Sequence, residues 1–237
     1  VTGYTARRVI VNDALCNKCH QELGPFTQEA FHAGQRNDAT TCSWCHNPNR
    51  ASSGWSADST AFVHAIHAAA KRTVPYNWHS ISATNGFFKI GYPGILNSCE
   101  TCHTADGYDF SSAAASAAQP NKQYRTVMTG NSAAATISTS PYVAQVAGTA
   151  YGSGFSYSAG TQAITAAAGT TLVSSPTVAV CTACHDSAVA TQHMESNGGS
   201  FYKDRTSALA KAEQCMFCHS SSSAFGLGIK AVHTVKK

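Results

Sequence analysis

The stretch Cys16-Asn17-Lys18-Cys19-His20 carries the pattern Cys-x-x-Cys-His, and this pattern decides the fold. The pattern recurs four times, beginning at residues 42, 99, 181 and 215, and no cysteine lies outside a copy. The ten cysteines are Cys16, Cys19, Cys42, Cys45, Cys99, Cys102, Cys181, Cys184, Cys215 and Cys218. The histidines that close the five copies are His20, His46, His103, His185 and His219.

This pattern is typical of covalent c-type haem attachment. Two thiols three positions apart can reach the two vinyl groups of one porphyrin, and the adjacent imidazole then meets the iron from one face. The sequence therefore predicts five covalently bound haem c groups, with the ten cysteines as thioether ligands and the five motif histidines as proximal iron ligands. Three alternatives explain the repeat less well. Zinc knuckles work in pairs and five leave one over, disulfides do not require five identical motifs, and a thioredoxin-like motif normally occurs once.

Six further histidines supply the candidates for the distal iron ligands. Five haems with six-coordinate iron need five of them, and two imidazoles per iron give a lower potential than a His/Met pair. We predict bis-histidine ligation, with the distal ligands His32, His64, His67, His193 and His233. His79 is the sixth candidate, because an imidazole beside Trp78 can instead cover a haem edge. His64 and His67 are spaced to share one side of a helix, so both can ligate, or one can support the other.

The composition offers little material for an ordinary core. Leu, Ile, Val and Phe make up 38 of the 237 residues, about 16%, and a chain that builds its own core usually has roughly 20% or more. We expect the haems to replace the missing core. The predicted fold class is a multihaem cytochrome c, mostly coil with short α-helices wrapped around five haems and little β-structure. Helices are expected over residues 58–71, 186–197 and 206–214, where capping residues and helix formers coincide.

The motif spacing suggests a single pentahaem domain over residues 1–237 with three parts. Residues 1–110 form a three-haem part, residues 111–178 an insert rich in Ala, Ser, Gly and Thr, and residues 179–237 a two-haem part. We expect the insert to be an ordered surface excursion with a small hairpin, since 161–173 has β tendency while 151–157 looks like a turn-rich loop. The alternative is a flexible linker between two lobes.

Charge and localisation follow from the haems. The net charge is +4, and seven basic residues are candidates to neutralise haem propionates, with solvated surface charge as the alternative: Arg36, Lys71, Arg72, Lys89, Arg125, Lys203 and Arg205. Haem attachment takes place outside the cytoplasm, so we expect a periplasmic, outer-surface or secreted protein. No apolar run reaches the length of a membrane span, no basic cluster suggests nucleic acid, and the start at Val1 is taken as processed or cloned.

Several stretches around the motifs resemble the decahaem outer-surface cytochromes of metal-reducing bacteria, and the likeness spans most of residues 7–233. These stretches are FHAGQRND (31–38), YPGILNS (92–98), QHMESNGG (192–199) and KAVH (230–233). The resemblance implies one pentahaem domain of proteins in which such domains alternate with small β-barrels. It further implies bis-histidine haems in a branched chain that carries electrons to minerals, metal complexes or flavins. The chain has no β-barrel part, its histidine-free segment 104–180 is long, and residues 5–13 look like a strand arriving from a preceding domain, which leaves open a larger cytochrome or a partner subunit.

The expected function is extracytoplasmic electron transfer by haem-to-haem hopping, with redox proteins and extracellular metal or flavin acceptors as partners. Enzymatic catalysis is not expected, although low-potential haems can reduce metals non-specifically. One alternative is a multihaem reductase, which needs an iron with an open distal position. Another is a haem-filament subunit, in which a surplus histidine completes a haem of the next molecule. The histidine supply exceeds the demand, which favours electron transfer.

Overall fold

The computed structural model describes residues 9–20, 31–105, 107–109, 123–129, 136–144, 155–158, 160–161, 164–166 and 171–233. The chain divides into two compact units. The first unit comprises Val1–Cys45, Asn97–Ala118 and Phe217–Lys237, and the second comprises His46–Leu96 and Gln119–Met216. Their boundaries fall inside the second and fifth motifs, after Cys45 and after Met216. The predicted division into a three-haem part, an insert and a two-haem part concerns bound haems and stays a prediction.

The first unit is a set of short helical turns joined by coil. Its elements are α1 (Asp13–His20), η1 (Phe31–Gly34), α2 (Cys42–Cys45), η4 (Cys99–Thr101) and α10 (Ile229–Val232), while α9 (Met216–His219) begins at the last residue of the second unit. A single β-bridge pairs Val11 with His103, and the Thr104 amide donates to the Ile10 oxygen at 2.9 Å. No hydrophobic side chain is buried among the described residues of this unit. Backbone bonds at the haem motifs therefore carry much of its order.

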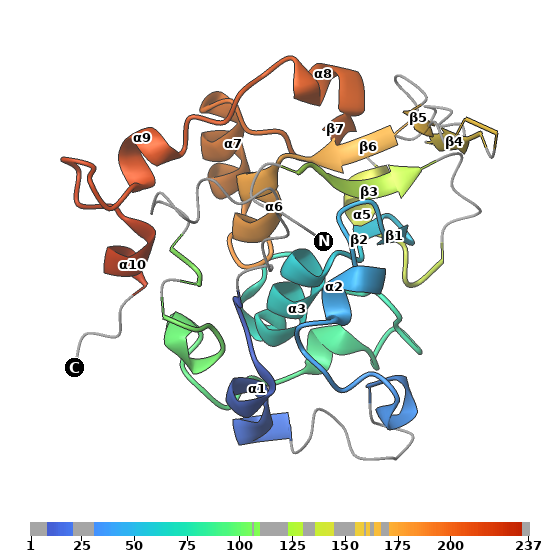
Figure 1. Ribbon diagram of the computed structural model, residues 1–237, viewed down its shortest axis with the longest axis vertical. Coiled ribbons are helices and arrows are strands. Elements are labelled where there is room, and N and C mark those ends of the chain that lie inside the picture. The colour runs from blue at the N-terminus through green and yellow to red at the C-terminus, as the bar shows by residue number, and fades with distance from the viewer. Residues whose placement is uncertain are drawn as a thin grey trace. The chain divides into compact units, whose positions relative to one another are not determined.

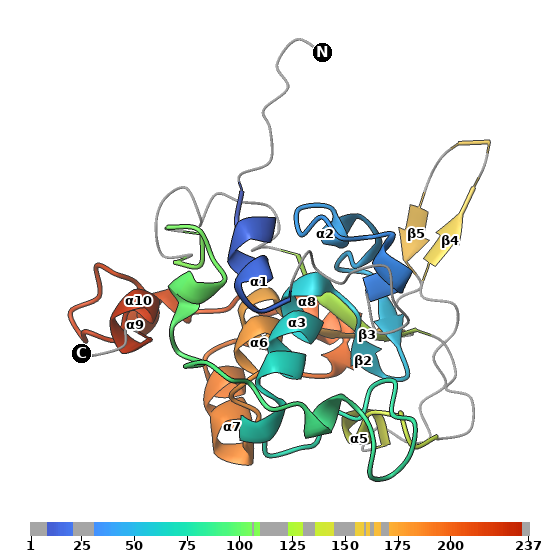
Figure 2. The ribbon, with the colours of Figure 1, turned by 90° about the horizontal axis from the view of Figure 1, so that it is seen from below.

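The second unit is built around a three-stranded antiparallel sheet in the order β3 (Arg125–Thr129), β6 (Thr171–Ser174) and β7 (Lys203–Asp204), seen side by side in Figure 1. The register shifts between Thr126 and Met128, where β3 forms a bulge opposite β6. Its other elements are β1 (Ala51–Ser52), β2 (Trp55–Ser56), α3 (Ser59–His67), η2 (Ala69–Lys71), η3 (Phe87–Lys89), α5 (Pro141–Ala144), β4 (Phe155–Tyr157), β5 (Ile164–Ala166), α6 (Pro176–Cys181), α7 (Ala188–Ser196) and α8 (Arg205–Leu209). Helix α3 lies beside α6 (Figure 2).

Two clusters of buried side chains form the core of the second unit. One is largely aromatic and includes Trp55, Ala57, Ala65, Tyr76, Trp78 and Ala183. The other covers the sheet and contains Val127, Met128, Val143, Leu172 and Tyr202. The second unit thus has a protein core of its own, which the low content of large aliphatic residues did not predict.

The helix predictions hold where a local cap defines the helix. The Asp58 carboxylate accepts the Thr60 amide at 3.0 Å and starts α3, which ends at His67 and is followed by η2 to Lys71. Helix α7 ends at Ser196, and its C-cap Asn197 is followed by Gly198 with φ +82°. The helix expected over 206–214 is wrong beyond Leu209, because the chain turns to other partners there. The Gln214 amide donates to the Asn197 oxygen at 3.0 Å, and the Glu213 carboxylate caps α6.

The insert, residues 111–178, contains a β-hairpin and also contributes two strands to the core of the second unit. Strands β4 and β5 pair antiparallel, as the predicted small hairpin, and stand away from the sheet in Figure 2. The description of 151–157 as a turn-rich loop is wrong for Phe155–Tyr157, which form β4. The surface location is wrong for β3 and β6, since Leu172 and Val173 are fully buried. The other predictions for residues 111–178 lie largely outside the described residues. No helix in the described part of the chain is long and apolar enough to cross a membrane.

Candidate haem-binding sites

Each Cys-x-x-Cys-His motif lies on a single helical turn. The first is contained in α1, the second begins α2, the third begins η4, the fourth starts at the last residue of α6, and the fifth leads into α9. In the third motif the His103 amide donates to the Cys99 oxygen at 2.9 Å, and in the fourth the His185 amide donates to the Cys181 oxygen at 2.7 Å. One turn of helix brings residues three and four apart onto one side. Both thiols and the imidazole of one motif can therefore reach the same porphyrin.

The ten cysteines form no disulfides; eight are partly buried, and Cys19 and Cys45 are exposed. Burial is the main cause that raises the pKa of Cys16 to about 11, with smaller contributions from Cys102, Asp13 and Cys42. Burial likewise raises the pKa of Cys181 to about 12, and the Cys215 charge adds to it. The thiols of Cys16, Cys42 and Cys102, one from each of the first three motifs, thus lie within electrostatic reach in the first unit, and those of Cys181 and Cys215 do so in the second unit.

Five histidines show the orientation that an iron ligand needs. In each the ring Nδ1 lies within 2.5–3.0 Å of a backbone carbonyl oxygen, which can only accept a hydrogen bond. The proton therefore sits on Nδ1 and the lone pair on Nε2, which is the tautomer that second-shell carbonyls impose on metal-binding histidines. The pairs are His46 with Ala57, His64 with Thr60, His67 with Val63, His219 with Leu227 and His233 with Ile229. These residues fit a haem iron.

Helix α3 presents two of the predicted distal ligands. The Nδ1 atoms of His64 and His67 each lie within hydrogen-bond distance of the carbonyl oxygen four residues earlier, at 2.5 and 2.8 Å. Burial lowers the pKa of His64, which keeps the imidazole in the neutral form that ligates iron. The ring of His67 meets Tyr92 edge-on with centroids 5.7 Å apart. The geometry suits two ligands and gives no preference for one over the other.

The other three candidates differ in their backbone. His32 and His79 have φ of 49° and 52°, in the left-handed region that is uncommon for residues other than glycine. The His79 ring lies 4.4 Å from that of Trp78, as expected for a histidine that covers an aromatic edge. His193 is exposed on α7. Which of the six histidines is not a ligand stays a prediction.

Comparison with known protein families decides the class of the protein. Residues 8–234 match the family described as outer membrane cytochrome MtrC/MtrF-like, domains II/IV. The chain belongs to this family. No curated protein sequence matches it at a significant level. Membership confirms the resemblance to outer-surface cytochromes, the multihaem c-type fold class and an extracytoplasmic location.

Among MtrC/MtrF-like cytochromes the cysteines bind haem, and the activity of the family is extracellular electron transfer. The described part of the chain, which includes all ten cysteines, holds no group of three or more His, Cys, Asp or Glu side chains arranged to bind a metal ion.

Two of the predicted propionate partners are used inside the protein. Arg72 pairs with Asp186 at 3.2 Å and Arg125 with Asp58 at 2.9 Å, and all four side chains are almost fully buried. Both arginines, named as candidates for propionates or for solvated surface charge, are instead paired with buried carboxylates of the protein. Lys203 bonds to Glu195 at 3.1 Å on the surface.

The sequence analysis missed the side chains that support the motifs. Asp186 directly follows the fourth motif, and Glu213 lies two residues before the fifth. Both carboxylates accept backbone amides, from Thr73 and Val74 for Asp186 and from Thr177 and Val178 for Glu213. Their position beside a motif was a visible signal, but their partners are more than 30 residues away in the sequence and could not be identified from it.

Proposed function

We propose that this chain binds five haems with two histidines per iron and conducts electrons between them toward extracellular acceptors, namely metal oxides, metal complexes or flavins. The observation that best supports this proposal is that five histidines, two proximal and three distal, are hydrogen-bonded through Nδ1 to backbone carbonyls. Each bound haem supplies an iron that accepts and gives up one electron. The rest of the work belongs to the residues of the chain.

The chain's contribution is to hold the ligands still. A histidine whose Nδ1 is hydrogen-bonded to the backbone keeps the orientation of its ring when the charge of the iron that it would ligate changes. Little rearrangement then accompanies each electron transfer, and fast exchange requires this. His46 shows the arrangement well: its ring is tied to the Ala57 oxygen at 2.9 Å, its backbone oxygen accepts the Ser59 amide at 2.9 Å, and Phe62 packs on its ring at 4.6 Å.

Electron transfer is favoured over a reductase by the ligand supply. A reductase needs one iron whose distal side is open to substrate, whereas this chain has six histidines for five distal positions. The filament alternative requires a surplus histidine at the surface, and the exposed His79 is the residue to examine for it.

The test is a haem count followed by a ligand-binding spectrum. Intact-mass measurement of the purified protein should give five covalent haems. The dithionite-reduced protein should then show the same low-spin spectrum with and without carbon monoxide. A change that amounts to one haem would identify an open iron and favour the reductase, and a mass below five haems would overturn the count. Loss of one low-spin haem on dilution, with restoration at high concentration, would favour the filament.

A further inference from the structure

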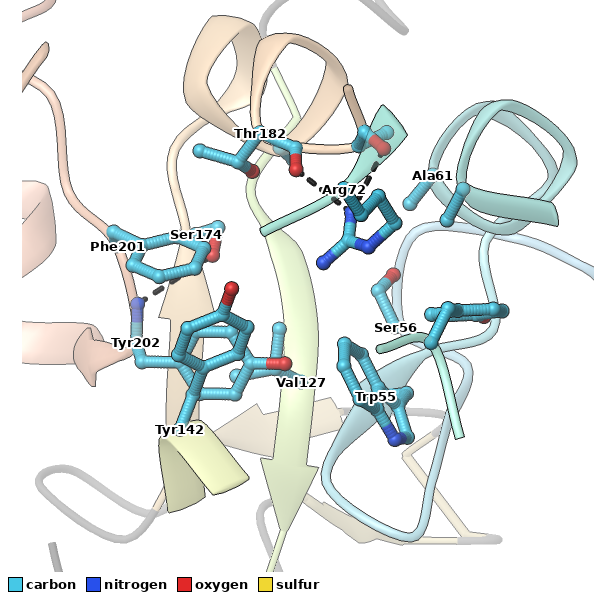
Figure 3. Close-up of a pocket in the computed structure, with 14 residues that line it drawn as sticks. Trp55, Ser56, Ala61, Arg72, Val127, Tyr142, Ser174, Thr182, Phe201 and Tyr202 are labelled. Carbon is cyan, nitrogen blue, oxygen red and sulfur yellow. Dashed lines mark hydrogen bonds between the residues drawn. The ribbon is translucent and has the colours of Figure 1, made fainter. Parts of the chain in front are cut away.

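The fourth haem motif is held by a buried arginine from a distant part of the second unit. The Nη1 of Arg72 donates to the backbone oxygens of Thr182 and Ala183, at 2.9 and 2.7 Å. These are the two residues between Cys181 and Cys184, so the guanidinium closes the loop that separates the two thioether positions. Figure 3 shows Arg72 reaching the Thr182 oxygen.

The carboxylate of Asp186 links the other end of the same motif to the segment that contains Arg72. Asp186 directly follows the proximal His185, and its Oδ2 lies 3.2 Å from the Nη2 of Arg72. The Thr73 amide donates to Oδ1 at 2.7 Å and the Val74 amide to Oδ2 at 2.9 Å. The short segment 72–74 therefore holds the motif both at its cysteine loop and just after its histidine.

The pair lies in apolar surroundings. The side chains of Arg72 and Asp186 are 3% and 1% exposed. The guanidinium carbon of Arg72 is 5.7 Å from the ring centres of both Trp55 and Tyr76, and the Tyr142 hydroxyl donates to Asp186 at 3.3 Å. Charges shielded from water act on their neighbours over longer distances than surface charges do. Either charge alone would be felt strongly at the motif, and as a pair they offset each other.

We propose that Arg72 and Asp186 are positioning residues for the haem of the fourth motif and together set its reduction potential. This inference rests on the proposed function, because it requires a haem at Cys181, Cys184 and His185. The guanidinium favours the reduced haem, which carries one positive charge less, and the carboxylate favours the oxidised haem. Removing the charge of one residue leaves the charge of the other residue uncompensated beside the haem.

The experiment is a pair of single substitutions in the full haem-loaded chain, Arg72→Gln and Asp186→Asn. A spectroscopic redox titration should show one of the five haems shifted to lower potential in Arg72→Gln and to higher potential in Asp186→Asn. Opposite signs are the decisive result, since a merely structural role would disturb the haem in the same direction in both variants. Lys211→Gln removes a positive charge from an exposed side chain and should shift none of the haems measurably.

Two further measurements keep the test decisive. Arg72→Lys retains the charge without bridging both carbonyls, so the potential of the haem should lie closer to its value in the unmodified protein than in Arg72→Gln. Should Arg72→Gln not fold, the double variant Arg72→Gln/Asp186→Asn replaces it, and its haem should have a lower potential than in Asp186→Asn alone. Peptide mapping of the unmodified protein must first show haem on the peptide with Cys181 and Cys184. A peptide without haem would overturn the proposed function itself. Haem present, with no shift or shifts of one sign, would overturn only the role of the pair.

Discussion

The two units of this chain carry haem motifs of the same kind on very different supports. The second unit buries two side-chain clusters, among them Trp55, Tyr76 and Leu172, and two ion pairs. The first unit buries no hydrophobic side chain among its described residues, and its Trp44 and Phe217 are 74% and 76% exposed. Both of these lie between the two cysteines of a motif, beside the thioether positions. From this comparison we expect the first unit to depend on bound haem for a core and the second unit to fold around its own side chains.

Withholding haem should have the largest effect, and it tests directly whether the two units differ in their dependence on the cofactor. In chain produced without haem attachment, we expect the amides of β3, β6 and α6 to stay protected from hydrogen exchange and those of α1 and α10 to lose protection entirely. A core formed by protein side chains remains when the cofactor is absent, whereas a core formed by bound haem is lost with the haem. Peptide-resolved hydrogen exchange measures this. Equal protection of both units would refute the comparison.

The next effect concerns the buried ion pairs of the second unit. Asp58→Ala removes the partner of Arg125 and the cap of α3 together, so we expect it to lower the free energy of unfolding of this unit by about 3–5 kcal/mol. The exposed pair is the matched control: Lys203→Ala should cost less than about 1 kcal/mol. Denaturant unfolding followed by the fluorescence of the haem-free chain measures both. A cost for Asp58→Ala as small as that for Lys203→Ala would show that the pair does not support the core.

A smaller effect sharpens the same contrast with two glycines of similar backbone. Gly198 in the second unit and Gly226 in the first have φ of +82° and +65°. A Cβ at Gly198 would lie 2.1 Å from the Ala212 oxygen, whereas at Gly226 it would meet open space. Gly226→Ala should therefore cost only the strain of the left-handed backbone, roughly 1–2 kcal/mol. Gly198→Ala should cost clearly more. Thermal unfolding of the haem-loaded variants tests this, and equal costs would mean that packing near Gly198 yields easily.

The smallest effect on folding accompanies a sharp spectroscopic change. His193→Ala on α7 of the second unit should open one iron, raise its potential and allow it to bind carbon monoxide, while the unit stays folded. His233→Ala should open one iron in the first unit and also loosen α10, whose last turn is tied by the His233 ring to the Ile229 oxygen at 2.9 Å. Carbon monoxide difference spectra count the opened irons. A wholly low-spin spectrum for either variant would remove that histidine from the set of distal ligands.

The local features of this protein could be predicted from its sequence. The Cys-x-x-Cys-His turns, the Asp58 cap of α3 and the stop of α7 before Gly198 each depend on residues within a few positions of one another. The family assignment rests on the same short motifs and is confirmed by the match over residues 8–234.

The long-range structure could not be predicted. Strands β3 and β6 pair across more than 40 residues of a segment whose composition suggests a loop, and only the folded sheet shows that Val173 is buried. Arg72 reaches the fourth motif across 110 residues. A basic residue in a haem protein is read most simply as a propionate partner, and nothing near Arg72 in the sequence points to Asp186 instead. Pairings of this kind depend on the whole fold, so a pattern of neighbouring residues does not encode them.

The acceptors that orient the five anchored histidines are all main-chain carbonyls, those of Ala57, Thr60, Val63, Leu227 and Ile229. A point mutation replaces a side chain and leaves the carbonyl of that residue in place. Ligand orientation is consequently robust to mutation at these five positions, provided that the local turn is kept. Under the proposed function, mutations could therefore alter the surfaces around the haems, and with them the choice of electron acceptor, without changing the orientation of these five histidines.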